Sequence, residues 1–337
     1  MRLGAIGDVV FASCLLPALR QAYPNAHLAW LVEPSAAPLL QNNPYLDEVI
    51  VWEKGRWLDD LKKGRFLSLL RKIHNLRQTL KTHHFDWALD LQGLLKSHLL
   101  AYCSGAAERI GFLAKEGGNF LLTKTFAKGG EKQKIASEYR DFAEKIGLAM
   151  HPLRFGIHLD SADYEAAKKC LQSIGVNGPF VAFCPFTTRP QKHWFIDRWA
   201  ILAEMLYKDL GLDIVLLGGL GDMAKANALN QQAGDRLKNL AGQTSLRQSA
   251  AIIALADAVI GVDTGMTHLA VVLGVPTIAL FGSTRPYLDA ENFKLEIIYK
   301  ALPCSPCRRK PSCHGDYSCM RSIMPDEVSM VLRKMLS

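Results

Sequence analysis

The sequence lacks the features of a membrane-spanning or exported protein. No apolar run reaches the roughly 18 residues that a membrane-spanning helix needs. An acid, Asp8, stands where a secretory leader would have its apolar core, so export is not expected. Eight cysteines in 337 residues are too few for a disulfide framework. These absences predict a soluble, cytoplasmic protein whose thiols are reduced.

Neither the composition nor the net charge is extreme. Hydrophobic residues make up 49% of the chain and charged residues 21%, which excludes a disordered chain, a coiled coil and a collagen-like repeat. The 40 Lys and Arg residues exceed the 32 Asp and Glu residues and give a net charge of +8. Most of this excess lies in one basic segment, residues 54–81, where nine basic residues face only Asp59 and Asp60.

The second half of the basic segment predicts an amphipathic helix with a basic outer face. Apolar residues from Phe66 to Leu80 recur there at helical spacing. Two interpretations remain open: a solvated helix face, or a docking surface for a phosphorylated substrate, nucleic acid or an acidic membrane. Nucleic acid fits least, because no aromatic residues alternate with the charges to stack on bases.

Short apolar strands alternate with helical patterns along the whole chain. The expected strands are His27–Val32, Val49–Trp52, Trp87–Leu91, Arg109–Phe112, Phe180–Phe183, Asp213–Leu217, Ala258–Val262 and Thr277–Phe281. Such strands are typical of buried parallel sheets with crossover helices. A polar stretch around residues 150–178 interrupts the pattern. We therefore predict an α/β protein with two Rossmann-like domains, residues 1–155 and 156–337, facing across a ligand-binding cleft. In an alternative arrangement, the last helix packs back on the N-terminal domain.

The first candidate binding loop is Gly4-Ala5-Ile6-Gly7-Asp8, which precedes a helical pattern. Glycine permits a tight turn, and the start of the following helix can receive an anionic group. The spacing matches neither the dinucleotide fingerprint nor the phosphate-binding P-loop, so a redox enzyme is disfavoured. Asp8 has a second interpretation, as a cap of the helix.

The second loop follows the expected strand Phe180–Phe183 and holds Thr187, Thr188 and Lys192. Two hydroxyl groups and a cation at the carboxyl end of a strand suit phosphate oxygens. The composition of an ordinary surface loop explains these residues nearly as well.

The third loop is Asp263-Thr264-Gly265, between the strand Ala258–Val262 and a helix. Asp263, Thr264 and the unpaired amides at the helix start would converge on a diphosphate. His268 lies one turn later on the same side of the helix. The alternative for His268 is a buried, hydrogen-bonded histidine.

Four cysteines are close together near the C-terminus: Cys304, Cys307, Cys313 and Cys319. The Cys-x2-Cys pair is a normal half of a structural zinc site, and four thiolates could complete a tetrahedron. The second pair has an irregular spacing for such a site. A loop of reduced thiols is therefore the favoured interpretation, with structural zinc as the alternative.

Together, these motifs resemble glycosyltransferase family 9, the bacterial lipopolysaccharide heptosyltransferases, and within it most closely the heptosyltransferase I group. The segments that carry the resemblance are Leu3–Asp8, Asp90–Ser97, Arg109–Phe112, Thr187-Thr188 with Lys192–Trp194, and Val262–His268. They extend over nearly the whole chain.

The resemblance implies the GT-B arrangement of two facing Rossmann-like domains. It also implies inverting transfer of L-glycero-D-manno-heptose from ADP-heptose to the Kdo of the lipid A inner core, without a cofactor or a metal. The sequence agrees on the metal, since it has no Asp-x-Asp motif to carry a divalent ion. The enzyme would act at the cytoplasmic face of the inner membrane, in peripheral contact with the anionic lipid surface.

The resemblance also assigns roles to residues. The expected donor-binding residues are Thr187, Thr188, Lys192, Asp222, Asp263, Thr264, Gly265 and His268. The expected acceptor-binding residues are Gly7, Arg56, Lys62, Lys63, Arg65 and Gln92. For catalysis we expect Asp8 to act as the general base, and Lys192, with the helix start at Thr264, to stabilise the leaving ADP.

Two features depart from the family pattern. Only Met1–Leu3 precede Gly4, so we expect either a very short first strand or a start further upstream. Asp222 stands where the family has a glutamate that contacts the nucleoside, and its shorter side chain could still accept a ribose hydroxyl.

Two alternatives to heptosyltransferase I remain open. One is heptosyltransferase II, or another family 9 core enzyme with a different acceptor or sugar. The other belongs to a different class, a nucleotide-binding module without turnover.

Overall fold

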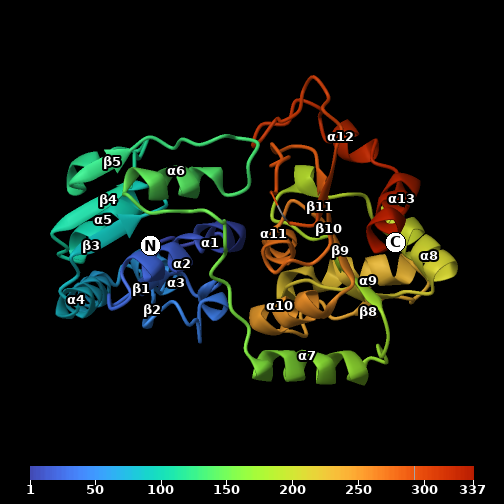
Figure 1. Cartoon of the computed structure of the whole chain (residues 1–337), viewed down its shortest axis with the longest axis horizontal. Helices are drawn as coiled ribbons and strands as arrows, with labels where there is room; N and C mark the ends of the chain where they lie inside the picture. Colours follow the sequence, from blue (N-terminus) through green and yellow to red (C-terminus); the bar gives the residue numbers. More distant parts are fainter. Residues whose placement is uncertain (292) are drawn as a thin grey trace. The chain divides into compact units, whose positions relative to one another are not determined.

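The computed structural model describes residues 1–291 and 293–337, which form two compact units (Figure 1). The N-terminal unit comprises residues 1–132 and 136–158. The C-terminal unit comprises residues 133–135 and 159–337. The chain thus leaves the first unit at residue 158, close to the predicted boundary at 155, whereas no sequence pattern indicates the separate assignment of residues 133–135.

The N-terminal unit contains two parallel sheets. One pairs β1 (Ala29–Val32) with β2 (Glu48–Val51). The other has the order β3 (Trp87–Asp90), β4 (Glu108–Phe112) and β5 (Lys124–Phe126). All strands are parallel, so the loops that follow them lie at one edge of each sheet.

Residues 1–3 connect these two sheets by backbone hydrogen bonds. The amino group of Met1 donates to the carbonyl of Leu89, and the amide of Leu91 donates to the carbonyl of Met1. On the other side, the amide of Glu33 donates to the carbonyl of Leu3. The three residues therefore occupy a strand-like position between β1 and β3, and the Gly-rich turn follows at the carboxyl edge.

The helices of the N-terminal unit are α1 (Ile6–Ala12), α2 (Leu15–Ala22), α3 (Lys54–Lys62), α4 (Phe66–Thr82), α5 (Leu95–Cys103) and α6 (Ser137–Lys145), with the 3-10 turns η1 (Ala37–Leu39) and η2 (Asn119–Leu121). Their apolar faces meet the sheets in a core that includes Leu3, Leu31, Trp52, Leu80 and Leu100.

The C-terminal unit is built on one six-stranded parallel sheet. Its strand order is β11-β10-β9-β6-β7-β8, with β6 (Phe180–Cys184), β7 (Asp213–Leu216), β8 (Lys238–Asn239), β9 (Ala258–Val262), β10 (Thr277–Phe281) and β11 (Leu295–Tyr299). Every residue of β6, β9 and β10 is buried, which explains why these strands are continuously apolar in the sequence.

Helices pack on this sheet, and their ends follow local sequence signals. They are α7 (Ser161–Ser173), α8 (Ile196–Leu210), α9 (Met223–Gln232), α10 (Leu246–Leu255), α11 (Gly265–Val272), α12 (Ser318–Arg321) and α13 (Pro325–Leu336), with the 3-10 turns η3 (Pro190–Lys192) and η4 (Leu220–Asp222). The Ser245 side chain caps α10 by accepting from the amide of Gln248. Gly211, with a φ of 63°, ends α8 in the left-handed conformation.

The order of the strands reverses at β6, which has β7 on one side and β9 on the other. In open parallel sheets, ligands bind outside the carboxyl ends of the strands at such a reversal. The loops after β6 and β9 contain Lys192 and Asp263. The topology therefore brings together the second and third candidate loops.

The structure confirms all eight expected strands and the helix expected between Phe66 and Leu80. The last helix, α13, packs on α8 and β10 of its own unit. The basic segment forms two helices, α3 and α4, and α4 buries only the C-terminal end of its apolar face: Leu80 is 2% exposed, whereas Leu67 is 86% exposed.

No helix within the described residues has the length and apolarity required to cross a membrane.

Candidate functional site

The best-defined polar site of the C-terminal unit surrounds Asp263, directly after β9. The Nζ of Lys192 lies 2.6 Å from its Oδ2, and the Nε2 of His268 lies 3.0 Å from its Oδ1. Thr284 donates its hydroxyl hydrogen to the same carboxylate. The side chain of Asp263 is only 12% exposed. A buried carboxylate with three partners is stable only while those partners remain in place.

The electrostatics of this cluster keep Asp263 ionised. Burial on its own raises the pKa of the Asp263 carboxyl, but the hydrogen bond and charge of His268 and the charge of Lys192 lower that pKa well below the ordinary range. Tyr287 hydrogen-bonds to His268 Nδ1 at 2.8 Å, and burial, together with the nearby Asp263 charge, raises the pKa of Tyr287. His268 thus uses both ring nitrogens within the protein.

The backbone around Asp263 requires a glycine and a threonine. A Cβ on Gly261 would lie 2.1 Å from the Oγ1 of Thr267, so only glycine fits there. Thr267 is fully buried and donates to the carbonyl of Val262 at 2.7 Å. This contact holds the first turn of α11 against the end of β9. Thr264 occupies the N-cap position of α11 and makes no capping hydrogen bond with its side chain, and Gly265 follows it, half-exposed.

Lys192 reaches Asp263 from a loop that is anchored on both sides. The Lys192 Nζ also lies 3.3 Å from the backbone oxygen of Asp263. The side chain of Gln191 donates to the carbonyl of Arg308 at 2.9 Å, and the buried indole of Trp194 donates to the carbonyl of Ile323 at 3.1 Å. The cation is therefore fixed at the carboxyl edge of the sheet, with 16% of its side chain exposed.

The two threonines of this loop differ in their contacts. Thr187 donates weakly, at 3.5 Å, to the backbone oxygen of Asp263, and its own carbonyl contacts the ring of His193 at 2.9 Å. Thr188 is exposed. The structure brings Thr187, Lys192, Asp263 and His268 together, and Thr188 lies at the open side of the loop.

Asp222 ends the short turn after β7. One of its carboxylate oxygens accepts from the amide of Gly219 at 2.9 Å, so this side chain closes the turn that leads into α9. The residue is half-buried.

In the N-terminal unit, Asp8 lies in the first turn of α1 and forms an ion pair with Arg2. The N-cap position belongs to Ala5, so the interpretation of Asp8 as the cap of this helix is wrong. The side chain of Asp8 is 46% exposed, whereas that of Arg2 is 9% exposed. Gly7 precedes Asp8 in the same turn and is half-exposed. Asp8 is therefore an accessible carboxylate whose buried partner orients it.

Gln92 has a structural contact rather than an open position. It is 8% exposed, and its side-chain oxygen accepts from the amide of Leu3 at 3.0 Å. Its backbone amide donates to the fully buried Asp90 at 2.9 Å. Asp90 also accepts from Ser97 at 2.7 Å. The predicted role of Gln92 in acceptor binding thus competes with its place in the turn after β3.

The four cations expected to bind the acceptor lie on or between α3 and α4. Lys63 and Arg65 each lie 2.9 Å from Asp59, and Arg56 lies 3.6 Å from Glu53. Within the described part of the chain, Lys62 forms no ion pair. These three pairs are exposed and weak, so the cations can exchange them for an anionic ligand. Arg65 has a second partner, the Oδ1 of Asp60 at 3.3 Å, whose side chain is only 4% exposed.

The comparisons with known proteins agree with one another. The sequence model of glycosyltransferase family 9 (heptosyltransferase) matches residues 73–318. The chain belongs to glycosyltransferase family 9.

Individual members of family 9 are similar to this chain over most of its length. Lipopolysaccharide heptosyltransferase 1 of Pseudomonas aeruginosa is 27% identical over 317 residues, covering 92% of this chain and 85% of that protein. Lipopolysaccharide heptosyltransferase 2 of Escherichia coli is 26% identical over 352 residues, covering 98% and 96%. The structure of an E. coli heptosyltransferase with ADP superposes with a TM-score of 0.74 at 23% identity, covering 99% of this chain and 100% of that one. The fold is thus that of the family 9 heptosyltransferases.

Sequence reasoning missed several residues at both sites of this family 9 chain. Thr284 and Tyr287 follow β10 and meet the Asp263 cluster because β10 is the neighbour of β9. The apolar run of β10 ending in a glycine marks this loop, but the sequence does not give the strand order.

The N-terminal unit has a second unpredicted cluster, beside Gly4. The Glu33 carboxylate lies 3.3 Å from the Nζ of Lys54 and 3.5 Å from the Nζ of Lys96. Glu33 also lies against Gly4, where an added Cβ would come within 3.8 Å of its carboxylate. Burial and the neighbouring charge of Lys54 lower the pKa of Lys96. Two cations share one carboxylate, which leaves a net positive charge at the carboxyl edge of the N-terminal sheets.

The C-terminal cysteines do not form a compact set of metal ligands. Within the described residues, the group whose potential ligand atoms lie within 4.8 Å of one another is His27, Glu48 and His83. The four cysteines are free thiols, with Cys304 exposed and Cys319 buried. The zinc alternative for this loop therefore finds no support in the arrangement of the thiols.

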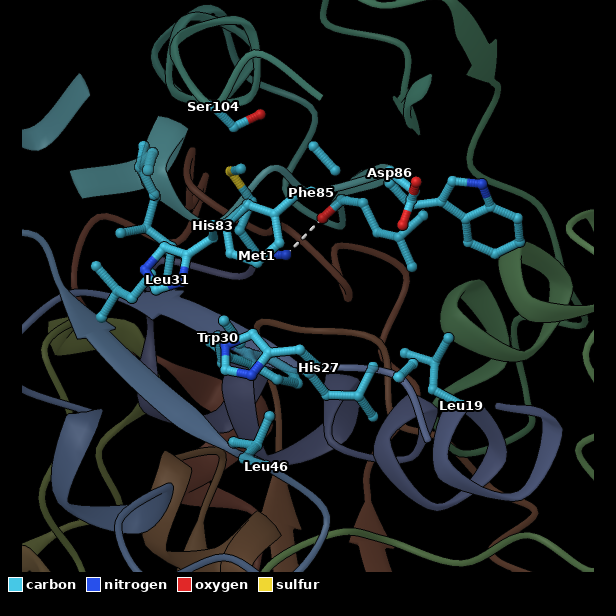
Figure 2. A pocket seen from close by; sticks show the side chains of 18 of the residues that line it. Met1, Leu19, His27, Trp30, Leu31, Leu46, His83, Phe85, Asp86 and Ser104 are labelled. Carbon is cyan, nitrogen blue, oxygen red and sulfur yellow. Dashed lines mark hydrogen bonds between the residues drawn. The ribbon is translucent and has the colours of Figure 1, made fainter. Parts of the chain in front are cut away.

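A cavity of about 440 Å³ in the N-terminal unit lies apart from the predicted site residues (Figure 2). Apolar side chains line it, from β1, from β3 and from α2, among them Trp30, Leu31 and Leu19. None of the residues expected to bind donor or acceptor contributes to its wall. Its apolar lining does not suit a nucleotide sugar.

We expect Asp263→Asn to lower the free energy of unfolding by roughly 3 kcal/mol at neutral pH, because it leaves the Lys192 cation buried without its partner. The pKa of Asp263 is lower in the folded protein than the value of about 3.9 for an unfolded aspartate. Its contribution to stability is therefore present above about pH 4 and is lost as the pH falls below that value.

Urea unfolding of the parent and the variant between pH 7 and pH 3 tests this expectation. Asp222→Asn serves as the control, because the asparagine oxygen can still accept from the amide of Gly219 and no ion pair is lost, for a cost of at most about 1 kcal/mol. Equal losses in the two variants, or a difference that stays constant below pH 4, would contradict the assigned role of Asp263.

Proposed function

We propose that this enzyme transfers L-glycero-D-manno-heptose from ADP-heptose to the Kdo of the lipid A inner core, with inversion and without a divalent ion. The observation that carries the proposal is the fixed Lys192 beside the start of α11, at the reversal of strand order in a family 9 fold. The relatives named lipopolysaccharide heptosyltransferase 1 and 2 have nearly equal sequence identities to this chain, 27% and 26%.

The donor half of the proposal rests on the C-terminal unit. An E. coli heptosyltransferase of the same fold was solved with ADP. Here, Lys192 and the unpaired amides at Thr264 and Gly265 provide positive charge where a diphosphate would leave. Asp263 is itself an anion, so it positions Lys192 rather than binding the diphosphate. A fixed cation and helix-start amides can replace a metal in stabilising the leaving group.

The acceptor half rests on the N-terminal unit. Kdo carries a carboxylate and lipid A carries phosphates, so a site for them needs cations. Lys54 and Lys96 supply such charge beside Gly4, and the basic segment adds more on α3 and α4. The tip of these two helices also exposes Phe66 and Leu67, which are 61% and 86% exposed. Exposed apolar residues among basic ones are typical of proteins that lie on an anionic membrane.

Asp8 is the proposed general base. Inverting transfer uses a carboxylate that takes the proton of the acceptor hydroxyl as the leaving group departs on the opposite side. Asp8 is accessible and belongs to the Gly-rich turn beside the Glu33 cluster. The ion pair with Arg2 orients the carboxylate and leaves its second oxygen for the acceptor.

A transfer assay tests the function directly. With purified enzyme, ADP-heptose and EDTA, we expect Kdo-lipid A to gain one heptose by mass spectrometry, and an acceptor that already carries a heptose to remain unchanged. Transfer only to the second acceptor would support heptosyltransferase II instead. Binding of ADP with no transfer would support a nucleotide-binding module. Activity that needs Mg²⁺ in place of EDTA would overturn the metal-free account.

For Asp8→Asn we expect kcat to fall by about 100-fold or more with little change in donor binding, because the amide cannot accept the proton. Asp47→Asn is the matched control: Asp47 is 42% exposed and pairs with Arg20 at 2.7 Å, so it loses an aspartate–arginine ion pair at the opposite, amino-terminal edge of the β1–β2 sheet. Steady-state kinetics of both variants test whether Asp8 acts as the general base. A kcat of Asp8→Asn within a few-fold of the parent would remove Asp8 as the base.

A triple variant, Lys62→Ala with Lys63→Ala and Arg65→Ala, should weaken binding to vesicles that contain anionic lipid by at least about tenfold and raise the acceptor KM. Its control replaces three exposed lysines of the C-terminal unit, Lys168, Lys169 and Lys208, by alanine. Sedimentation with vesicles and kinetics at two salt concentrations provide the measurement. If both triple variants behave alike, the basic segment is only a solvated surface.

A further inference from the structure

Three side chains from distant parts of the sequence meet at the amino-terminal edge of the β1–β2 sheet. His27 lies two residues before β1, Glu48 is the first residue of β2, and His83 follows the last turn of α4. All strands of the unit are parallel, so this edge is opposite to the edge that carries Asp8 and Glu33. No part of the proposed transfer reaction uses these three residues.

Their geometry is that of a metal site. The Nε2 of His27 lies 3.6 Å and the Nε2 of His83 lies 3.3 Å from the same carboxylate oxygen of Glu48. The three potential ligand atoms lie within 4.8 Å of one another. Two ligands bound to zinc at about 2.0–2.1 Å with tetrahedral angles lie about 3.3 Å apart. Small side-chain adjustments therefore suffice to place an ion among these atoms.

We propose that His27, Glu48 and His83 bind one Zn²⁺ ion. Two imidazoles and a carboxylate suit zinc and disfavour Mg²⁺, which prefers an all-oxygen shell. The three side chains are 49%, 36% and 21% exposed, so an ion can enter from solvent and a water molecule can complete its shell. This assignment is independent of the proposed glycosyl transfer.

The two imidazole rings that carry ligand atoms lie nearly parallel to each other. The ring centroids of His27 and His83 are 5.5 Å apart with an angle of 10° between the planes. The ring of Phe85 lies beside both, with its centroid 5.0 Å from that of His83 and 6.4 Å from that of His27. Figure 2 shows His27, His83 and Phe85 together at the border of the apolar cavity. An imidazole nitrogen binds a metal in the plane of its own ring, so at least one of the two rings must turn about its Cβ–Cγ bond when the ion binds.

The bound ion would link the amino-terminal end of β2 to the segments that precede β1 and β3. These three segments hold residues 27, 48 and 83, so the ion closes long stretches of chain at one point. Binding to the folded state alone raises stability in proportion to the logarithm of the free zinc concentration. We therefore expect zinc to stabilise the N-terminal unit and to leave the transfer reaction unchanged.

The experiment is a zinc titration of the full-length chain by calorimetry, with thermal unfolding beside it. The parent should bind one equivalent of Zn²⁺ that Mg²⁺ does not displace, and its melting temperature should rise. His83→Asn and Glu48→Gln should each lose that equivalent and the rise. His84→Asn is the control, since His84 is an exposed neighbour with a φ of 48°, a conformation that asparagine accepts.

The thiols of the C-terminal cysteines are a second place where zinc could bind, and Co²⁺ distinguishes the two. Cobalt held by imidazole and carboxylate gives visible absorption without the strong near-ultraviolet charge-transfer band that thiolate ligands produce. For the parent we expect visible absorption without the near-ultraviolet band. In His83→Asn we expect that visible absorption to be lost. A thiolate spectrum, full zinc binding in His83→Asn, or no binding by the parent would each overturn the proposal.

Discussion

The buried carboxylate of Asp263 is the interaction on which the site of the C-terminal unit depends. It joins Lys192 from the loop after β6, Thr284 from the loop after β10, and His268 from α11. These segments can meet because β6, β9 and β10 are neighbours with a common carboxyl edge. Taking a carboxylate out of water is unfavourable unless each partner is present. The cluster therefore fixes the cation before any ligand arrives, as a preorganised site requires.

Two acids of the N-terminal unit differ strongly in exposure and in partners. Asp90 is fully buried and serves the turn after β3 through Ser97 and the amide of Gln92. Asp8 is 46% exposed and has one cationic partner, Arg2. A group that must exchange a proton with substrate needs access, whereas a group that holds a turn does not. Both carboxylates follow neighbouring segments at the same edge of the sheets, and only the structure shows that Asp90 is buried and Asp8 is accessible.

Local patterns predicted the elements with a strong apolar signal and failed where tertiary context decides. The eight apolar strands are all present, but β8 has two residues and β11 has mixed burial, so neither stands out in the sequence. The loops with Lys192 and Asp263 were predicted from their composition. Thr284 was not, because its importance follows from the position of β10 beside β9. Helical spacing predicted α4, yet periodicity does not show whether another element covers its face.

The short segment 133–135 has a consequence for dividing this protein. The chain enters the C-terminal unit there, returns to the N-terminal unit, and leaves it again after residue 158. Ile135 is fully buried, and the backbone of Gln133 and Ile135 exchanges two hydrogen bonds with Asp289. A C-terminal fragment beginning at residue 159 would leave those groups of Asp289 unpaired and a void in place of the isoleucine. If the chain were divided after residue 158, the N-terminal piece would still contain residues 133–135, which belong to the fold of the C-terminal unit.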